Sequence, residues 1–416
     1  MAPPDRKPGH EPADDRPRGA VQLAFSRSFG PYFWALLTSV SGMWIFNIVA
    51  VIVAFDISGS ALVVGLVGSM QFLPQFFITP ISGRFADQGN AVLQMLLGRI
   101  IMTTGTGSLA LWIWWTDPAQ RDAWPLLAVS LYIGLGFAIG GPAMQTLIPT
   151  LVREQELPAA MTLNSVPMTV ARSAGPAFGA FIALHFGAGA GFFTAALCNL
   201  AFVIVVAAQR YGRGLRRNEQ ADYSVRAGIV YARRTRPLSL LLLAGTATAL
   251  AADPALTLLP TLVDDRSGDA AMVGWIASSF GIGSAFGLPL VPTLARHIGL
   301  ERLSACGLVT MSAGLGIAAI PSALAALTGF LVCGTGMSLA LTAVMTLTQQ
   351  HAVAHMRGRV MALLLVALLG SRPVAATANG AVADLTSATV AMLMISALTL
   401  FIAYLSRPGR LRVHGR

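Results

Sequence analysis

Residues 32–55 read YFWALLTSVSGMWIFNIVAVIVAF, a stretch without a charged side chain. A helix rises about 1.5 Å per residue, so a stretch of this length crosses a hydrocarbon core of roughly 30 Å. Inside lipid the backbone amides have no water to bond, and a helix satisfies them within one segment. The stretch therefore predicts a membrane-spanning helix.

The same pattern recurs along the chain. Hydrophobic residues make up 55% of the sequence and charged residues 11%, with a mean hydropathy of +0.67. Soluble domains carry about 25% charged residues, so this chain has too little charge to cover a water-facing surface. We expect an all-α membrane protein with twelve spanning helices. The expected spans are 32–55, 61–82, 91–115, 124–149, 160–184, 189–209, 238–262, 271–294, 302–320, 323–348, 359–383 and 388–406.

Charge placement predicts the orientation. The net charge is +10, and the arginines cluster in short connections between the apolar blocks, as in cytoplasmic loops. With the N-terminus in the cytoplasm, only Arg121 and Arg266 would lie outside, where the connections carry several aspartates instead. We therefore expect a multi-pass membrane protein with both termini cytoplasmic. A nucleic-acid partner is not expected, because it would need a soluble basic face.

The longest cytoplasmic connection is rich in arginine and divides the chain near its middle. Part of it, residues 221–234, is expected to form an amphipathic helix on the membrane surface, held by anionic lipid. The proline-rich N-terminus is expected to be disordered. The expected organisation is a disordered cytoplasmic tail at 1–26, a six-helix bundle at 27–209, a cytoplasmic linker at 210–236, a second six-helix bundle at 237–406 and a cytoplasmic tail at 407–416.

An internal repeat supports this division. Two constant shifts along the chain, first of 209 residues and later of 200, superimpose residues of the first half on the second. The pairs include Gly65 with Gly274, Ser69 with Ser278 and Pro80 with Pro289 under the first shift, and Gly134 with Gly334, Met161 with Met361 and Arg172 with Arg372 under the second. The order of these pairs predicts two pseudo-symmetric six-helix bundles, with a substrate site near the midplane between them.

Two short motifs resemble those of major facilitator transporters. Gly83 and Asp87 match the loop motif between the second and third helices of that superfamily, although Gln88 and Asn90 stand where basic residues are usual. The resemblance implies a cytoplasmic gate in which Asp87 meets the N-terminus of the eleventh helix when the cavity opens outward. Arg357 and Arg359 are expected to add pairing there.

The second motif, Gly175-Pro176 followed by Gly179, looks like the helix-five motif of proton-driven exporters. Proline removes a backbone hydrogen bond, and small residues permit close helix packing. Longer stretches resemble the subfamily that contains the enterobactin exporter and the transmembrane secretion effectors, over about residues 25–400. They are Ser58-Gly-Ser-Ala61, Gln71-Phe-Leu-Pro74, Leu163-Asn-Ser165 and Arg357-Gly-Arg-Val360. This resemblance implies efflux of siderophores or drugs, driven by the proton gradient.

Four charged side chains fall well inside the expected spans, away from their first residues, where each costs at least about 2.5 kcal/mol on insertion scales. Arg99 is near enough to the cytoplasmic face to extend its guanidinium toward water. Arg172 and Arg372 are expected either to pack helices or to bind anionic groups of an anionic or zwitterionic cargo. Asp253 precedes Pro254 in a helix expected to break, and is a buried partner of an arginine, a solvated acid near the outer surface or the proton-coupling residue.

The remaining cavity-lining candidates are polar side chains placed by position alone: Asn47, Gln71, Gln75, Gln145 and Asn164. The chain carries no HExxH or GxSxG motif, so an enzyme is not expected. The three cysteines lie inside apolar blocks, and no metal or other cofactor is expected. Two alternatives to a monomeric exporter of a small organic molecule stay open, a flippase-like transporter of lysophospholipid and a non-transporting sensor of the same fold.

Overall fold

The computed structural model describes residues 18–88, 90–209, 225–266, 271–353 and 356–411. The side chains of 79–81, 83–88, 145–146, 225–228 and 357–358 lie outside the described part. Every regular element in these segments is a helix. The all-α class expected from the sequence is confirmed.

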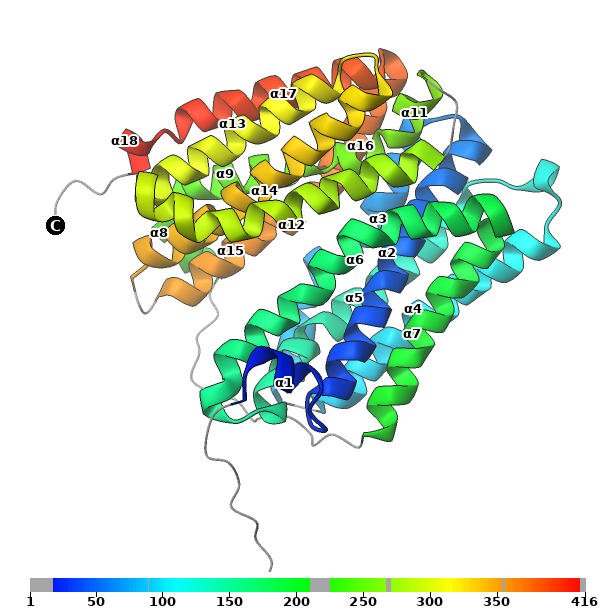
Figure 1. Ribbon diagram of the computed structural model, residues 1–416, viewed down its shortest axis with the longest axis horizontal. Helices are drawn as coiled ribbons and strands as arrows, with labels where there is room; N and C mark the ends of the chain where they lie inside the picture. Colours follow the sequence, from blue (N-terminus) through cyan, green and yellow to red (C-terminus); the bar gives the residue numbers. More distant parts are fainter. Residues whose placement is uncertain (1–17, 89, 210–224, 267–270, 354–355, 412–416) are drawn as a thin grey trace, which may run out of the picture.

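Twelve spans fall into two groups, and each expected span has its counterpart. The first group holds α2 (Gly30–Ser58), α3 (Ala61–Gln88), α4 (Ala91–Trp115), α5 (Trp124–Leu151), α6 (Leu157–Phe186) and α7 (Ala188–Ala208). The second holds α9 (Arg236–Ala252) continued by α10 (Pro254–Thr257) and α11 (Leu259–Asp264), then α12 (Ala271–Ile298), α13 (Leu300–Ala318), α14 (Ala323–His351), α15 (Arg357–Leu369) continued by α16 (Ser371–Leu385), and α17 (Ala388–Leu405). Figure 1 shows the two groups as separate layers of roughly antiparallel helices.

Length and apolarity alone identify ten of the twelve as membrane-spanning within the described residues. The other two are α6 and α13. Helix α6 carries Arg172 and several Thr and Ser residues, and α13 begins with Glu301 and Arg302, which lower their mean hydropathy. Large apolar side chains cover the outside of the helices, including Phe178, which is 56% exposed. An outward-facing apolar surface of this kind suits contact with lipid.

The two ends of the molecule differ. One end, called here the Arg-rich end, carries the short helices α1 (Ala20–Ala24), α8 (Val225–Arg234) and α18 (Pro408–Leu411). The other, called the acidic end, carries α11 and the short helix η1 (Pro118–Gln120). In Figure 1 the ribbons of the two groups lie close together at the acidic end and diverge toward the Arg-rich end.

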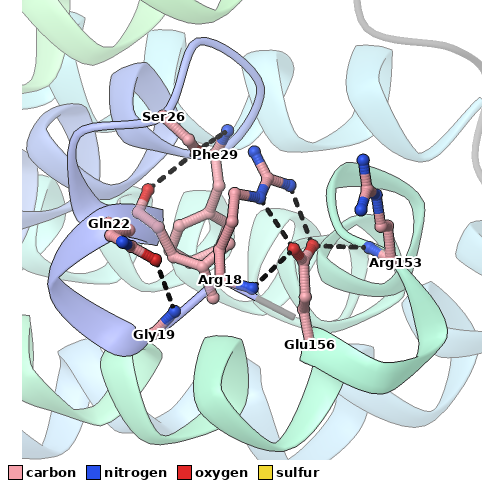
Figure 2. Close-up of polar contacts among 8 residues, drawn as sticks. Arg18, Gly19, Gln22, Ser26, Phe29, Arg153 and Glu156 are labelled. Carbon is pink, nitrogen blue, oxygen red and sulfur yellow. Dashed lines mark hydrogen bonds and ion pairs between the residues drawn. The ribbon is translucent and has the colours of Figure 1, made fainter. Parts of the chain in front are cut away.

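The N-terminal segment is ordered from Arg18 onward, so the expected disorder of residues 1–26 is wrong for its last part; residues 1–17 lie outside the described part. The Arg18 guanidinium donates to both carboxylate oxygens of Glu156, at 2.7 and 2.8 Å, and the Arg153 backbone N–H donates to the same carboxylate at 3.0 Å (Figure 2). Leu23 and Phe29 are fully buried against the first group. An ion pair and apolar burial together outweigh the entropy of this segment.

The hydrogen bonds from Arg18 lower the pKa of Glu156 from its ordinary 4.5 to about 2. Glu156 belongs to the short helix η2 (Glu154–Glu156), which connects α5 to α6 at the Arg-rich end. Its carboxylate is therefore ionised throughout the physiological pH range, and the contact holds the N-terminal segment to this connection.

The internal repeat is visible where the two groups touch. A Cβ atom on Gly65 of α3 would overlap the backbone carbonyl of Ala376 in α16. At the equivalent place, a Cβ on Gly274 of α12 would lie 2.9 Å from the Pro176 carbonyl oxygen in α6. Pro176 and Ala376 are themselves related by the shift of 200 residues. These two of the close contacts between the groups are therefore copies of one arrangement.

The paired serines follow the same rule. Ser69 of α3 donates to the Pro373 carbonyl at 2.7 Å and lies 2.8 Å from the Thr377 hydroxyl. Its repeat partner Ser278 accepts from the Ala177 backbone N–H at 2.9 Å. These serines fix the axial position of α3 on α16 and of α12 on α6.

Candidate functional site

Two of the twelve spans are interrupted within the membrane, and each break carries a charged side chain. The span made of α9, α10 and α11 breaks at Asp253, between α9 and α10. Pro254 has no backbone N–H and so cannot continue the helical hydrogen-bond pattern. The span made of α15 and α16 breaks at Gly370, where Arg372 precedes Pro373. Breaks of this kind in transporters place backbone and charge at a central site.

These two breaks face one cavity of about 40 Å³. Its walls come from α2 and α3 of the first group and from α9, α10 and α16 of the second. Polar and charged residues lining it are Asn47, Gln71, Asp253, Thr257 and Arg372, and apolar ones include Phe46 and Phe72. The structure thus brings four of the site candidates, Asn47, Gln71, Asp253 and Arg372, together between the two groups.

Asp253 is held by a residue that the sequence did not single out. The side-chain amide of Asn379, from α16, donates to the Asp253 carboxylate at 2.7 Å. Asn379 is buried and lies on the same helix as Arg372. A hydrogen bond donated to a carboxylate stabilises its ionised form. It lies seven residues, or two helical turns, from Arg372, so both side chains are on the same face of α16.

Arg372 lies over an aromatic ring in the same cavity. Its guanidinium carbon is 4.9 Å from the ring centroid of Phe72, on α3. Arg372 and Asp253 attract each other electrostatically, yet in the described structure no ion pair joins them. Each charge therefore keeps part of its bonding capacity for a third partner.

Asn47 and Gln71 form a polar pair across the first group. The Gln71 side-chain amide donates to the Asn47 side-chain oxygen at 3.1 Å, and both residues are less than 10% exposed. The pair presents hydrogen-bonding groups to the cavity opposite Asp253 and Arg372.

Arg172, the repeat partner of Arg372, does not line this cavity. Its guanidinium lies over Trp44, 5.4 Å from the ring centroid, and contacts the Met337 sulfur at 3.6 Å. Its Nε is buried without a hydrogen-bond partner. Arg172 is close enough to Arg372 for their charges to repel. It therefore lies between the groups, at the contact of α6 with α14, and beside the cavity.

The other polar candidates are dispersed. Gln75 is buried on α3 outside the cavity lining, and Asn164 lies on α6 with its side-chain oxygen buried and unbonded. Gln145 belongs to α5, and its side chain lies outside the described part.

The gate motif is only partly described. Gly83 and Asp87 lie on the last turns of α3 and Arg357 begins α15, but their side chains fall outside the described part. Arg359 is half-buried on α15, with one guanidinium nitrogen 3.3 Å from the Met356 sulfur. The contact of Asp87 with the start of α15 stays a prediction.

The Gly-Pro motif packs α6 against α2. A Cβ on Gly175 would lie 2.6 Å from the Trp44 Cβ, and one on Gly179 would lie 2.5 Å from Ile48. Helix α6 continues through Pro176. The two glycines therefore allow α2 and α6 to approach closely, as expected of small residues in membrane helices.

Arg99 does not reach the membrane surface, so that expectation is wrong. It is 5% exposed, donates to the Asn199 side-chain oxygen at 3.3 Å and lies 5.1 Å from the ring centroid of Phe202. Ser39 donates to the same oxygen at 2.7 Å. Hydrogen bonding and stacking on an aromatic face inside the bundle compensate the buried charge in place of water.

Comparisons with known proteins agree with this architecture. The sequence model of a family described as transmembrane secretion effector, within the major facilitator group, matches residues 25–413. No curated protein sequence matches the chain.

Solved transporter structures share the fold. A POT family transporter in complex with a thioalcohol-conjugated peptide superposes with a TM-score of 0.74 at 11% identity, covering 92% of this chain and 96% of its own. The nucleoside transporter NupG gives 0.73 at 11%, covering 93% and 98%. A bacterial homologue of the human lysosomal transporter Spinster, in an inward-facing and unoccupied conformation, gives 0.69 at 14%, covering 93% and 94%.

Proposed function

Because the chain belongs to the transmembrane secretion effector family of major facilitator transporters, we propose that it exports a small organic molecule, siderophore-like or drug-like, in exchange for protons. The family consists of multi-pass secondary transporters and not of enzymes. The observation that carries the proposal is the shared cavity of Asp253 and Arg372, one acid and one base at two helix breaks between the two groups.

Exchange requires that the proton and the cargo exclude each other. Ionised Asp253 attracts a cationic group on the cargo, and protonation of Asp253 removes that attraction. Arg372 binds carboxylate or catecholate oxygens, for which the planar guanidinium is suited. A zwitterionic cargo uses both side chains and is released when Asp253 takes up a proton.

A purely anionic cargo behaves differently. It competes with ionised Asp253 for Arg372, so it binds better when Asp253 is protonated, and proton and cargo then travel together. Within the anionic or zwitterionic class expected from the sequence, exchange therefore favours the zwitterion. Arg172, beside the cavity, contributes a second positive charge when the cavity widens.

The volume of the cavity indicates when cargo binds. About 40 Å³ has room for roughly three water molecules. Drug-sized ligands occupy pockets of about 300–1,000 Å³. Cargo therefore enters after the two groups move apart, as alternating access around a central site requires.

The proposed orientation places the Arg-rich end in the cytoplasm of a bacterium and the acidic end outside the inner membrane, by the distribution of basic residues. We also propose that the protein is a monomer and that its domains have the boundaries expected from the sequence. In this orientation the two groups of helices diverge toward the cytoplasm, the side from which an exporter takes its cargo.

The test is flux in proteoliposomes under an imposed pH gradient. The probes are a catechol–amino acid conjugate and the same conjugate without its amine. We compare the wild type with Asp253→Asn, Arg372→Gln and Arg172→Gln, using Asp56→Asn, an exposed acid of α2, as the matched control. Asp253→Asn should abolish gradient-driven transport of the zwitterion, and Arg372→Gln should weaken its binding about tenfold or more.

Three results would contradict the proposal. Full gradient-driven transport by Asp253→Asn would remove the proton role. Unchanged affinity in both arginine variants would leave these side chains with helix packing alone. Faster gradient-driven accumulation of the amine-free anion in the direction of proton flow would replace exchange by co-transport.

A further inference from the structure

The acidic end is closed by a contact that lies outside the cavity. Asp384 is in the last turn of α16, and its carboxylate meets the first turn of α3 in the other group. It accepts from the Ala61 backbone N–H at 2.7 Å, from the Leu62 backbone N–H at 3.1 Å and from the Ser60 hydroxyl. These hydrogen bonds join residues more than 320 positions apart.

The carboxylate completes the capping of α3. The first N–H groups of a helix have no partner within the helix. The Val63 N–H bonds the Ser60 hydroxyl oxygen at 3.3 Å, which leaves the N–H groups of Ala61 and Leu62 for Asp384. The cap of this helix is therefore split between the two groups, and it is complete only when they touch.

Helix dipoles make this contact depend on conformation. A negative charge is favourable at a helix N-terminus and unfavourable at a C-terminus. Asp384 lies at the C-terminal end of its own helix, so its charge is stabilised there only while the N-terminus of α3 faces it. Separating the groups leaves two backbone N–H groups without their partner and the carboxylate beside a helix end of like sign.

The internal repeat does not preserve Asp384. At the position of α6 that the shift of 200 residues relates to Asp384, the chain carries Leu184. This position of α6 therefore has no carboxylate, and the repeat does not copy Asp384 into the first group.

We infer that Asp384 is the residue that holds the acidic end closed during transport. It does so by capping α3 across the interface, and it releases α3 when the molecule opens to the acidic side. The gate expected at the Arg-rich end uses the same two spans with their roles exchanged. There the aspartate is Asp87, in the last turn of α3, and the capped N-terminus is that of α15, which begins the partner span. Each span would then end in an aspartate that caps the other, one at a time. The inference rests on the proposed function only for alternating access, and it does not depend on the cargo or the proton site.

The experiment measures the distance between the groups at the acidic end. Spin labels on Ala119 and Ala323, exposed residues of the first and second groups, report it in a cysteine-free background. Asp384→Asn keeps an oxygen that can accept a hydrogen bond but loses the charge, and Asp384→Ala loses both. Asp56→Asn removes an exposed acid at the same end and is the control.

We expect the ratio of open to closed distances to rise about 5- to 30-fold in Asp384→Ala, less in Asp384→Asn, and not at all in the control. Purified protein needs neither cargo nor a pH gradient for this measurement, so its failure and the failure of the export proposal are distinguishable. A distance distribution in Asp384→Asn and Asp384→Ala equal to that of the wild type would overturn the inference. A lower melting temperature with unchanged distances would also overturn the inference, because Asp384 would then contribute to folding stability alone. If Asp384→Ala does not fold, the distances measured for the isosteric Asp384→Asn test the inference.

Discussion

Replacing Gly65 by alanine tests whether the close contact of α3 with α16 sets the conformational equilibrium. A Cβ at this position would overlap the Ala376 carbonyl oxygen and lie 2.8 Å from its carbonyl carbon. Non-bonded carbons are at their optimum at about 3.5–4.0 Å. The helices must therefore separate by roughly 1 Å at the acidic end, and the obstacle is backbone that cannot rotate away.

Overpacking of this kind costs about 1–3 kcal/mol. Helix α3 is helical in both conformations, so the gain in helix propensity from glycine to alanine cancels in the equilibrium between them. The cost then destabilises only the conformation in which the acidic end is closed. The population of the conformation open at the acidic end should increase about 5- to 150-fold. Export should slow, because every cycle passes through the state with the acidic end closed.

Gly68→Ala is the matched control. Gly68 lies less than one turn away on α3, and a Cβ there would meet the Ala376 Cβ at an ordinary 3.8 Å. The assay is the spin-label distance across the acidic end, with proteoliposome flux as the second readout. If Gly65→Ala and Gly68→Ala gave the same distances and the same flux, steric closure at Gly65 would be refuted.

Three further outcomes follow from named contacts. Glu156→Gln should lower stability by about 1–2 kcal/mol at pH 7 through loss of the charged hydrogen bonds from Arg18. Since the pKa of Glu156 is depressed to about 2, the stabilisation is complete above pH 4.5 and is lost as the pH falls toward 2; the difference in melting temperature between variant and wild type should be constant from pH 6 to 8 and shrink in acid. Arg99→Met should leave stability within about 1 kcal/mol of the wild type, because an apolar side chain of similar length replaces a buried charge, and a large drop in melting temperature would show that the Arg99 hydrogen bonds are indispensable. Asn379→Leu should slow proton-driven exchange, since it removes a hydrogen bond donated to the Asp253 carboxylate; an unchanged exchange rate would separate Asn379 from the proton site.

Much of the fold was predictable because lipid imposes a simple rule. Each span must be long, apolar and internally hydrogen-bonded, so segments such as 32–55 were identified by composition alone. The break at Asp253 was also predictable, because Pro254 removes a donor whatever its surroundings. The repeat placed Gly65 and Gly274 in register, and the structure finds both at contacts between the groups.

The site was only partly predictable. Charged residues in spans are rare enough to be candidates, which is how Asp253 and Arg372 were found. Their neighbour Asn379 was missed because a neutral amide inside a span has many possible roles. The repeat suggested equal roles for Arg172 and Arg372, yet only Arg372 lines the cavity, because Arg172 instead lies against Trp44 and Met337.

The sequence by itself determined the helices, the internal repeat and the distribution of charge between the two ends. These properties are local, since they depend on residues close together in the chain and on the medium around them. The tertiary structure alone decided which polar groups meet: Asp384 with the start of α3, Asn379 with Asp253, and Arg18 with Glu156. Partners of this kind are brought together by helix packing from distant parts of the chain, and no pattern in the neighbouring residues encodes them.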